Sequence, residues 1–211
     1  MSDEASAAAR LGAERFRIRP SAAADAPTLA RLHCDALPDA FLSGLGSGFL
    51  QVLYRALAAD PEAVVVVAER DGAIVGFVTG VPSVRRFYRR FFLRHAVRAA
   101  VAAAPAVLRP GVLRRMRETA SYPQGMSGLP EAELLSIAVV GAARRSRVAT
   151  ELVMRLFADL AARGVEEVKV VVSAGNLPAN RFYERVGFRL AGSTEVHEGD
   201  VSNVWVSRCR S

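Results

Sequence analysis

The sequence predicts an α/β domain built on a mixed sheet. Two β-branched runs, 63–68 and 73–80, flank an Asp71-Gly72 hairpin signal, so the sheet begins antiparallel. Further along, residues 134–188 read as strand, turn, helix, strand and short helix, which indicates a parallel βαβ unit. This change of pairing argues against a pure doubly wound fold.

Length and composition fit one domain with a substantial core. The 211 residues are 51% hydrophobic and 23% charged, which excludes a disordered chain. Cys34 and Cys209 are too few for a disulfide framework, so we expect packing roles for both and a reducing, cytoplasmic setting. Residues 1–14 lack the pattern of a secretory signal and are expected to form a flexible tail before a single domain, 15–211. No apolar run reaches the roughly 18 residues of a membrane-spanning helix.

The elements before the hairpin are a strand and two helices. Residues 15–20 alternate polar and apolar side chains, as a half-buried strand does. Asp25 is the expected N-cap of the first helix, which carries His33, a residue that is more often a packing group than a catalytic one. Leu37-Pro38 ends that helix, and residues 49–57 are expected to form the second.

The net charge of +7 is concentrated in residues 81–130. This helical insertion holds ten arginines and one acid, Glu118. On a helical projection of 84–98, an apolar arc opposes an arginine-covered side. The arc holds Val84, Phe87, Tyr88, Phe91 and Phe92, and the arginines are Arg85, Arg86, Arg89, Arg90 and Arg94. Three interpretations stay open: a packed helix with a solvated arginine face, a surface for an anionic substrate or partner, and a membrane-surface helix. A second helix is expected around 112–119.

The strand at 134–140 leads into an unusually positive turn. Arg144, Arg145 and Arg147 stand where the next helix begins, and Gly164 ends that helix. The unpaired N–H groups and the dipole of a helix N-terminus already favour an anion at such a position. The turn therefore predicts either a pyrophosphate site or a solvated basic loop.

A short helix with a polar stripe follows the second parallel strand, 168–172. Asn176 is positioned to cap this helix, and Gly187 to end it. Asn176, Asn180 and Tyr183 fall at i, i+4 and i+7, so they share one stripe that core packing does not require. The last two strands are expected to begin at Phe188 and at Val201.

These residues resemble the GNAT superfamily of acyl-CoA-dependent N-acetyltransferases. Arg144-Arg145-Ser146-Arg147-Val148-Ala149, after Val139-Val140, is similar to motif A, whose usual core is Arg/Gln-x-x-Gly-x-Gly/Ala. Asn176-x-x-Ala179-x-x-x-Tyr183-x-x-x-Gly187-Phe188 is similar to motif B. The resemblance implies a GNAT-like fold, a central and mostly antiparallel sheet of six to seven strands with helices on both faces. One departure is Arg147, where the family normally has a glycine that lets the backbone approach phosphate.

The resemblance implies that acetyl-CoA is the co-substrate and that no metal takes part. The backbone of the turn would hold the pyrophosphate, the preceding strand would pair with the pantetheine amides, and Tyr183 would protonate or hydrogen-bond the departing thiolate. The implied cofactor-binding residues are Val139, Val140, Arg144, Arg145, Ser146, Arg147, Val148, Ala149, Asn176 and Asn180.

The attacking amine must be neutral, so the reaction needs a base or a chain of water molecules that leads to one. Glu133 is the best candidate, because it precedes the apolar part of its strand and shares a face with Leu135, Ile137 and Val139. A surface glutamate at a strand start is the alternative.

Three functions are considered. The first is transfer of an acetyl group from acetyl-CoA to a primary amine of a small molecule or peptide, by direct attack in a ternary complex. The second is a non-catalytic acyl-CoA-binding module, with Arg147 marking lost activity. The third is an anionic-surface or nucleic-acid binder acting through the arginine-rich insertion. No nucleic-acid partner is expected, because the aromatics of the insertion lie on its buried arc. The arginines favour an acidic acceptor, and a homodimer stays open.

Overall fold

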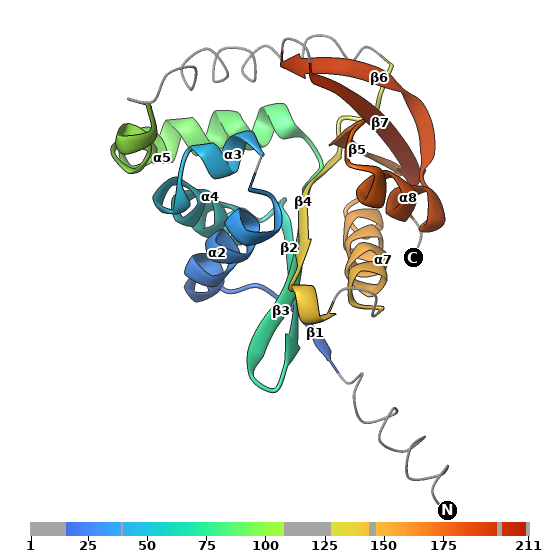
Figure 1. Ribbon diagram of the computed structural model, residues 1–211. Helices are drawn as coiled ribbons and strands as arrows, with labels where there is room; N and C mark the ends of the chain where they lie inside the picture. Colours follow the sequence, from blue (N-terminus) through green and yellow to red (C-terminus); the bar gives the residue numbers. More distant parts are fainter. Residues whose placement is uncertain (1–15, 39, 108–127, 144–146, 198–199, 210–211) are drawn as a thin grey trace, which may run out of the picture.

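The computed structural model describes residues 16–38, 40–107, 128–143, 147–197 and 200–209 (Figure 1). Its centre is a seven-stranded sheet with the order β1-β2-β3-β4-β5-β7-β6. Among the strands that the structure describes, only β4 and β5 are parallel neighbours, so the expected mixed, mostly antiparallel sheet is confirmed. The strands are β1 Arg17–Pro20, β2 Val64–Arg70, β3 Ala73–Val81, β4 Glu133–Val139, β5 Glu167–Ser173, β6 Arg189–His197 and β7 Asp200–Arg208.

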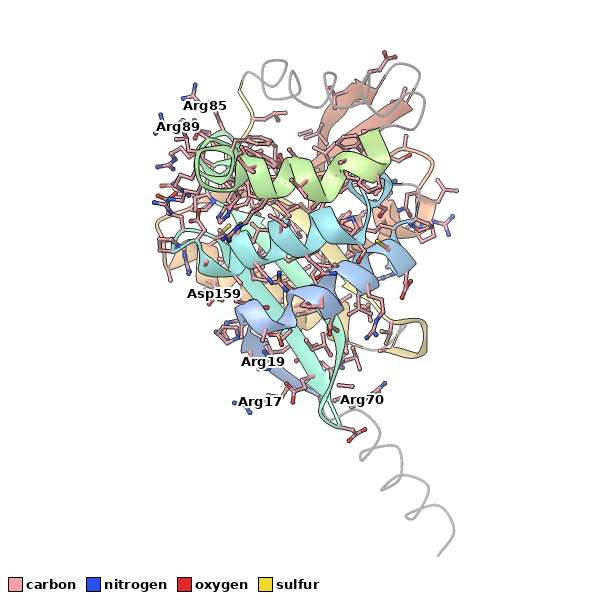
Figure 2. The ribbon with its side chains drawn as sticks, turned by 90° about the vertical axis from the view of Figure 1, so that its left-hand side faces the viewer. Arg17, Arg19, Arg70, Arg85, Arg89 and Asp159 are labelled. Atoms are coloured by element: carbon pink, nitrogen blue, oxygen red, sulfur yellow. The ribbon has the colours of Figure 1, made fainter. Side chains whose placement is uncertain are left out.

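Helices cover both faces of the sheet. One face, which we call the α5 face, carries α2 Ala26–Ala36, α3 Phe41–Gly44, α4 Ser47–Ala59 and α5 Val84–Val107. The other, which we call the α7 face, carries α7 Val148–Ala161 and α8 Leu177–Arg185. Figure 2 looks onto the α5 face, where α2, α4 and α5 lie side by side. Residues 1–14 and the second insertion helix expected at 112–119 lie outside the described residues.

Each face of the sheet has its own core because both sides are covered. In β2, Val65 and Val67 pack on the α5 face, while Val64 and Val66 pack on the α7 face. Both faces of this strand are buried, which explains why it reads as an unbroken apolar run. Across β3, a Cβ added to Gly80 would lie 2.8 Å from a methyl carbon of Leu156, so glycine here lets α7 pack closely on the sheet.

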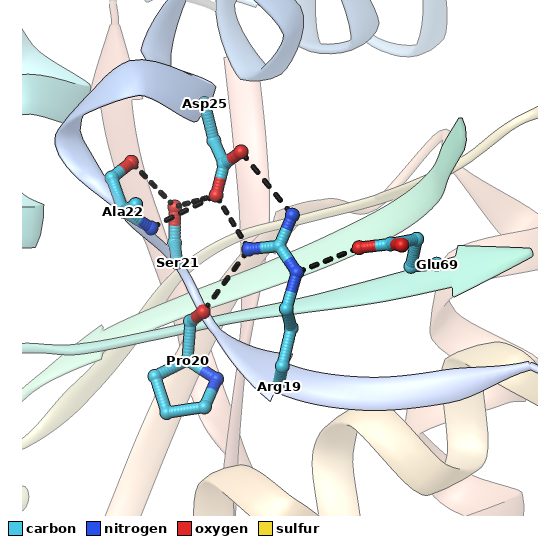
Figure 3. Close-up of polar contacts among 6 residues, drawn as sticks. All are labelled: Arg19, Pro20, Ser21, Ala22, Asp25 and Glu69. Atoms are coloured by element: carbon cyan, nitrogen blue, oxygen red, sulfur yellow. Dashed lines mark hydrogen bonds and ion pairs between the residues drawn. The ribbon is translucent and has the colours of Figure 1, made fainter. Parts of the chain in front are cut away.

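Asp25 is the N-cap residue of α2, as expected, but its side chain makes no hydrogen bond to the helix amides. A short 3₁₀ turn, η1 Ala23–Asp25, precedes α2, and the aspartate makes no side-chain cap. Its carboxylate instead accepts hydrogen bonds from Arg19 Nη1 at 2.7 Å and from the Ala22 amide at 2.8 Å (Figure 3). Arg19 Nε also donates a hydrogen bond to Glu69 at 2.7 Å. The hydrogen bond from Arg19 to Asp25 lowers the pKa of the Asp25 carboxyl. This network ties β1 to β2 and to the start of α2.

The insertion begins as one long helix, α5, of 24 residues. Phe87 and Phe91 are buried on the α5 face, with ring centroids 6.0 Å apart. Phe92, however, is 52% exposed, so it does not belong to the buried arc as predicted. One residue beyond Phe91 it is turned by roughly 100° around the helix, which carries it off the contact with the domain.

Candidate active site

The sheet is divided between β4 and β5. Each strand has seven residues, yet a single register pair joins them, Glu133 opposite Lys169. The Lys169 amide donates to the Ala132 carbonyl at 2.9 Å at the same point. No further register pair links these two strands, whereas β3 and β4, and β5 and β7, are paired along their lengths. The strands therefore diverge toward their carboxyl ends, and we call this divergence the β4–β5 split.

A β-bulge alters β4 just beyond that pair. Thr79 pairs with Ser136 and Gly80 pairs with Leu134, so Leu135 has no register partner on β3. An extra residue in one strand shifts its side-chain alternation by one position and re-aims the backbone that follows.

The bulge overturns part of the reasoning about Glu133. Leu135 packs on the α5 face, but Ile137 and Val139 pack on the α7 face. The prediction that Glu133 shares a face with all three residues is therefore wrong, because strict alternation holds only in a strand without a bulge.

The amides at the end of β4 point to opposite sides. The Val140 N–H donates to the Val75 carbonyl at 2.9 Å and is used within the sheet. Successive amides of a strand alternate, so the Val139 backbone points toward β5 and the split. Of the two predicted strand residues, Val139 has the backbone orientation that a ligand lying in the split needs.

Position 147 does not require the conformational freedom of glycine. Arg147 is the N-cap of α7 with φ −72° and ψ −3°, a right-handed helical conformation open to any residue. Its side chain is exposed at the positive end of the helix dipole. Val148 is buried in the α7-face core, and Ala149 is half-buried. Arg144, Arg145 and Ser146 lie outside the described residues.

The ends of α8 form as predicted. Asn176 is the N-cap, and its side chain accepts a hydrogen bond from the Ala179 amide at 3.2 Å. Gly187 follows the last turn with φ +99°, a left-handed conformation that favours glycine.

Asn180 uses its full hydrogen-bonding capacity inside the protein. Its Nδ2 donates to the carbonyls of Ser173 at 3.0 Å and Asn176 at 2.8 Å. Its Oδ1 accepts from Asn203 Nδ2 and from Trp205 Nε1, each at 2.9 Å. An amide side chain has two donors and two acceptor lone pairs, so a cofactor contact would have to displace one of these bonds. Sequence reasoning missed both β7 partners, because no local signal links them to α8.

Tyr183 lies in the α7-face core. It is 4% exposed, and its ring meets that of Phe188 edge-on with centroids 5.3 Å apart. Burial raises the pKa of its hydroxyl well above the ordinary value. Tyr183 is therefore a neutral hydrogen-bond donor throughout the physiological pH range.

Glu133 is a buried carboxyl beside one buried cation. It is 8% exposed, and its Oε2 lies 3.5 Å from Nζ of Lys169, which is 6% exposed. The distance makes this contact an ion pair and not a hydrogen bond, whereas Lys169 Nζ does donate to the Pro130 carbonyl. Burial raises the pKa of Glu133 to about 7, and Lys169 acts against that rise. A carboxyl that is half ionised near neutral pH is suited to accept and release a proton.

Tyr88 approaches this pair from α5. Burial, and then the charge of Glu133, raise the pKa of Tyr88 to about 12, so the phenol stays neutral. The same tyrosine lies close enough to Tyr54 of α4 to act on its pKa, so the polar groups continue toward α2 and α4.

A second group of buried polar side chains extends from there, and sequence reasoning missed most of it. His33 Nδ1 lies 2.5 Å from the Tyr54 hydroxyl, which also interacts with Ser136. Thr79 is the register partner of Ser136. Burial lowers the pKa of His33 to about 4, so its imidazole is neutral. Among the described residues, three side-chain atoms are buried without a hydrogen-bond partner: His33 Nε2, Thr79 Oγ1 and Glu133 Oε2. The sequence held one indication of this group, because Thr79 and Ser136 are polar residues within two otherwise apolar strands.

Together these side chains form what we call the buried polar cluster. It occupies the α5 face, while Tyr183 and Val148 belong to the α7 face. Its members are six buried side chains, His33, Tyr54, Thr79, Glu133, Ser136 and Lys169, and the half-buried Tyr88.

The fold and the site define a class of α/β proteins. In this class two parallel strands pair at one point and then diverge, and a helix begins shortly after the first of these two strands. Sequence comparison then identifies the family. The profile of the acetyltransferase (GNAT) family matches residues 30–188, more than half of the chain, and the protein belongs to this family. No curated protein matches the sequence.

Solved structures with this fold are distant in sequence. The ribosomal-protein-S18-alanine N-acetyltransferase from Escherichia coli superposes with a TM-score of 0.58 at 14% identity, over 93% of this chain and 96% of that one. An N-acetyltransferase from Staphylococcus aureus Mu50 gives 0.59 at 15% identity, over 93% and 99%. Arabidopsis thaliana NAA60 in complex with acetyl-CoA gives 0.58 at 19% identity, over 92% and 98%. At these identities the likeness establishes the fold, and the expected GNAT-like architecture is confirmed.

Proposed function

We propose that this protein transfers an acetyl group from acetyl-CoA to a primary amine of a small molecule or peptide, by direct attack in a ternary complex. The observation that carries the proposal is the β4–β5 split, with the buried carboxyl of Glu133 at its closed end. Membership of the acetyltransferase (GNAT) family supports it.

The described residues fit the co-substrate. Acetyl-CoA, when bound, supplies an activated acetyl thioester. Val139 is the residue of β4 whose backbone is oriented toward the split, as strand-like pairing with the amide groups of the co-substrate would require. The positive end of the α7 dipole and the exposed side chain of Arg147 would attract the phosphates. Asn180 contributes by fixing α8 against β5 and β7 through the bonds to Ser173 and Trp205.

Two side chains are assigned to proton transfer. Glu133 takes the proton of the acceptor ammonium, because its pKa of about 7 leaves a usable ionised fraction at neutral pH. Tyr183 donates its hydroxyl proton or a hydrogen bond to the departing thiolate, because burial keeps the phenol neutral. These residues lie on opposite faces of the sheet, so they would act on a reacting centre in the split from opposite sides.

The test is release of free thiol from acetyl-CoA in the presence of a panel of primary amines, with acidic and basic members. Amine-dependent thiol release supports the proposal. Binding of acetyl-CoA without thiol release, with every amine, would instead support the non-catalytic acyl-CoA-binding module. The φ of −72° at Arg147 suits arginine without backbone strain, and the binding measurement tests whether its side chain keeps phosphate away from the backbone.

The arginines of α5 bear on the choice of acceptor. Arg85, Arg86 and Arg89 are exposed, on a side of the helix away from Phe87 and Tyr88, which pack toward the domain. Their charge does not line the buried polar cluster. We therefore expect the hydroxyl-bearing and carboxylate groups of that cluster to select the amine. Comparing acidic with basic amines in the panel distinguishes this expectation from a preference for acidic acceptors.

A further inference from the structure

The solvent side of α5 carries an apolar stripe. Leu93 and Val97 are each 79% exposed, and Val101 is 70% exposed. They are spaced at i, i+4 and i+8, so they follow one line along the helix. Phe92, at 52%, lies beside them. Four of the eight large apolar side chains that are exposed in the described part of the chain thus gather on one helix.

Packing within the domain does not account for this stripe. α5 already buries a separate face, through Phe87 and Phe91 near its start and Ala99 and Ala103 further on. The exposed stripe lies on another side of the helix, and small exposed residues, Ala96, Ala100 and Ala104, extend its apolar surface. Exposed apolar patches of this kind mark interaction sites.

The stripe is accompanied by positive charge and no negative charge. α5 contains no aspartate or glutamate. Of its arginines, Arg90 pairs with Asp60 at 2.9 Å and with Glu62 at 3.1 Å. The others are exposed and form no ion pair with any residue that the structure describes: Arg85, Arg86, Arg89, Arg94 and Arg98. Figure 2 shows Arg85 and Arg89 projecting outward at one end of the helix, far from Arg17 and Arg70.

The arrangement of charge selects the partner. Arg94 and Arg98 each follow a stripe residue, while Arg85, Arg86 and Arg89 occupy the first two turns. A second copy of this chain would bring two acid-free, arginine-rich helices together, which like-charge repulsion disfavours. A bilayer surface with anionic headgroups meets both requirements, because phosphates accept the guanidinium groups and the acyl boundary accepts the apolar side chains.

We propose that α5 docks the protein on an anionic lipid bilayer, with Leu93, Val97 and Val101 inserted at the acyl boundary and the flanking arginines on the headgroup phosphates. Insertion is parallel to the surface, since none of the described helices is long and apolar enough to cross a membrane. The inference is independent of the proposed acetyl transfer, because none of these side chains belongs to the buried polar cluster or the β4–β5 split.

The test is flotation of the full chain with vesicles of phosphatidylcholine, with and without phosphatidylglycerol. We expect binding only to the anionic vesicles, falling steeply as salt is raised. The triple variant Leu93→Gln/Val97→Gln/Val101→Gln should weaken binding by about tenfold or more, since each residue gives up apolar burial. Leu190→Gln/Val201→Gln, exposed apolar residues of β6 and β7, is the matched control and should bind as the wild type does.

The charge contribution is tested in the same way. Arg85→Gln/Arg89→Gln should weaken vesicle binding and flatten its salt dependence, whereas Arg17→Gln/Arg208→Gln, an exposed pair elsewhere, should not. Circular dichroism of each variant checks that the fold is kept.

Four results would overturn the proposal. They are absence of binding to anionic vesicles at low salt, binding that the triple variant leaves unchanged, equally tight binding to DNA, and a dimer in sedimentation that the triple variant dissociates. The last two would assign the surface to a soluble polyanion or to a second copy of the chain.

Discussion

Replacing Lys169 by methionine is predicted to move the pH dependence of acetyl transfer. Lys169 Nζ lies 3.5 Å from the Glu133 carboxylate and is the charge that opposes the effect of burial on the pKa of that group. An opposite charge within ~4–6 Å lowers a carboxyl pKa by about one to three units. Without the ammonium, the pKa of Glu133 should rise from about 7 to about 8 or higher.

The size of the effect follows from the ionised fraction. A base must be deprotonated to accept the ammonium proton, so kcat/KM rises with pH and is half-maximal near the pKa of Glu133. At pH 7 the ionised fraction falls from roughly one half to about one tenth, which lowers kcat/KM about fivefold. The loss should disappear by about pH 9, and the KM for acetyl-CoA should stay unchanged, since Lys169 is not assigned to its binding.

The assay is thiol release measured across the pH range for three variants. Lys169→Arg keeps the charge and should keep the midpoint. Arg155→Met removes a more exposed ion pair, to Asp159 at 2.9 Å, and should leave the profile as it is in the wild type. An unchanged midpoint in Lys169→Met would refute the assignment of Glu133 as the base, and an equal loss at every pH would show that Lys169 acts only on the fold.

Three further outcomes are expected. Tyr183→Phe should lower kcat several-fold and leave coenzyme A affinity nearly unchanged in calorimetry, because the ring keeps its contact with Phe188; unaltered turnover would exclude the acid role. Asn180→Ala leaves the buried donor of Trp205 and the half-buried donor of Asn203 without an acceptor, so urea unfolding should show a loss of about 2–4 kcal/mol, and a loss below about 0.5 would contradict the structural role. His33 has a folded pKa of about 4, below its ordinary 6.5, so the protein should lose up to about 3 kcal/mol as pH falls from about 6.5 through 4. His33→Asn keeps a polar atom near the Tyr54 hydroxyl but cannot titrate, so its thermal stability should depend less on pH in this window; identical pH dependence would show that another group is responsible.

Features that depend on local chemistry could be predicted from the sequence. Asp71-Gly72 forms the expected hairpin turn, with φ of +52° and +77°, because both positions need a left-handed conformation. Asn176 caps α8 and Gly187 follows its last turn for equally local reasons. The order of strands and helices follows from hydrophobic periodicity, which each element displays within its own length.

Features that depend on tertiary pairing could not be predicted from the sequence. The bulge at Leu135 arises from the register of β4 on β3, and it changed which residues share a face with Glu133. Lys169 meets Glu133 only because the two strands touch at one point, although as the chain's single lysine it was conspicuous in composition. Asn180 lies on α8, on the polar stripe that the sequence predicted, but its hydrogen-bond partners on β7 come from a distant part of the chain.

The β4–β5 split also has a mechanical consequence. β1 to β4 form one continuous hydrogen-bonded leaf and β5, β7 and β6 form another, and a single register pair holds the two leaves edge to edge. A ligand that pairs with β4 would serve as a missing strand and join the leaves into one cooperative unit. Amide hydrogen exchange in β4 and β5 should therefore slow more on acetyl-CoA binding than exchange in β1 or β6. Release of the product would then loosen the sheet at the β4–β5 split in every turnover.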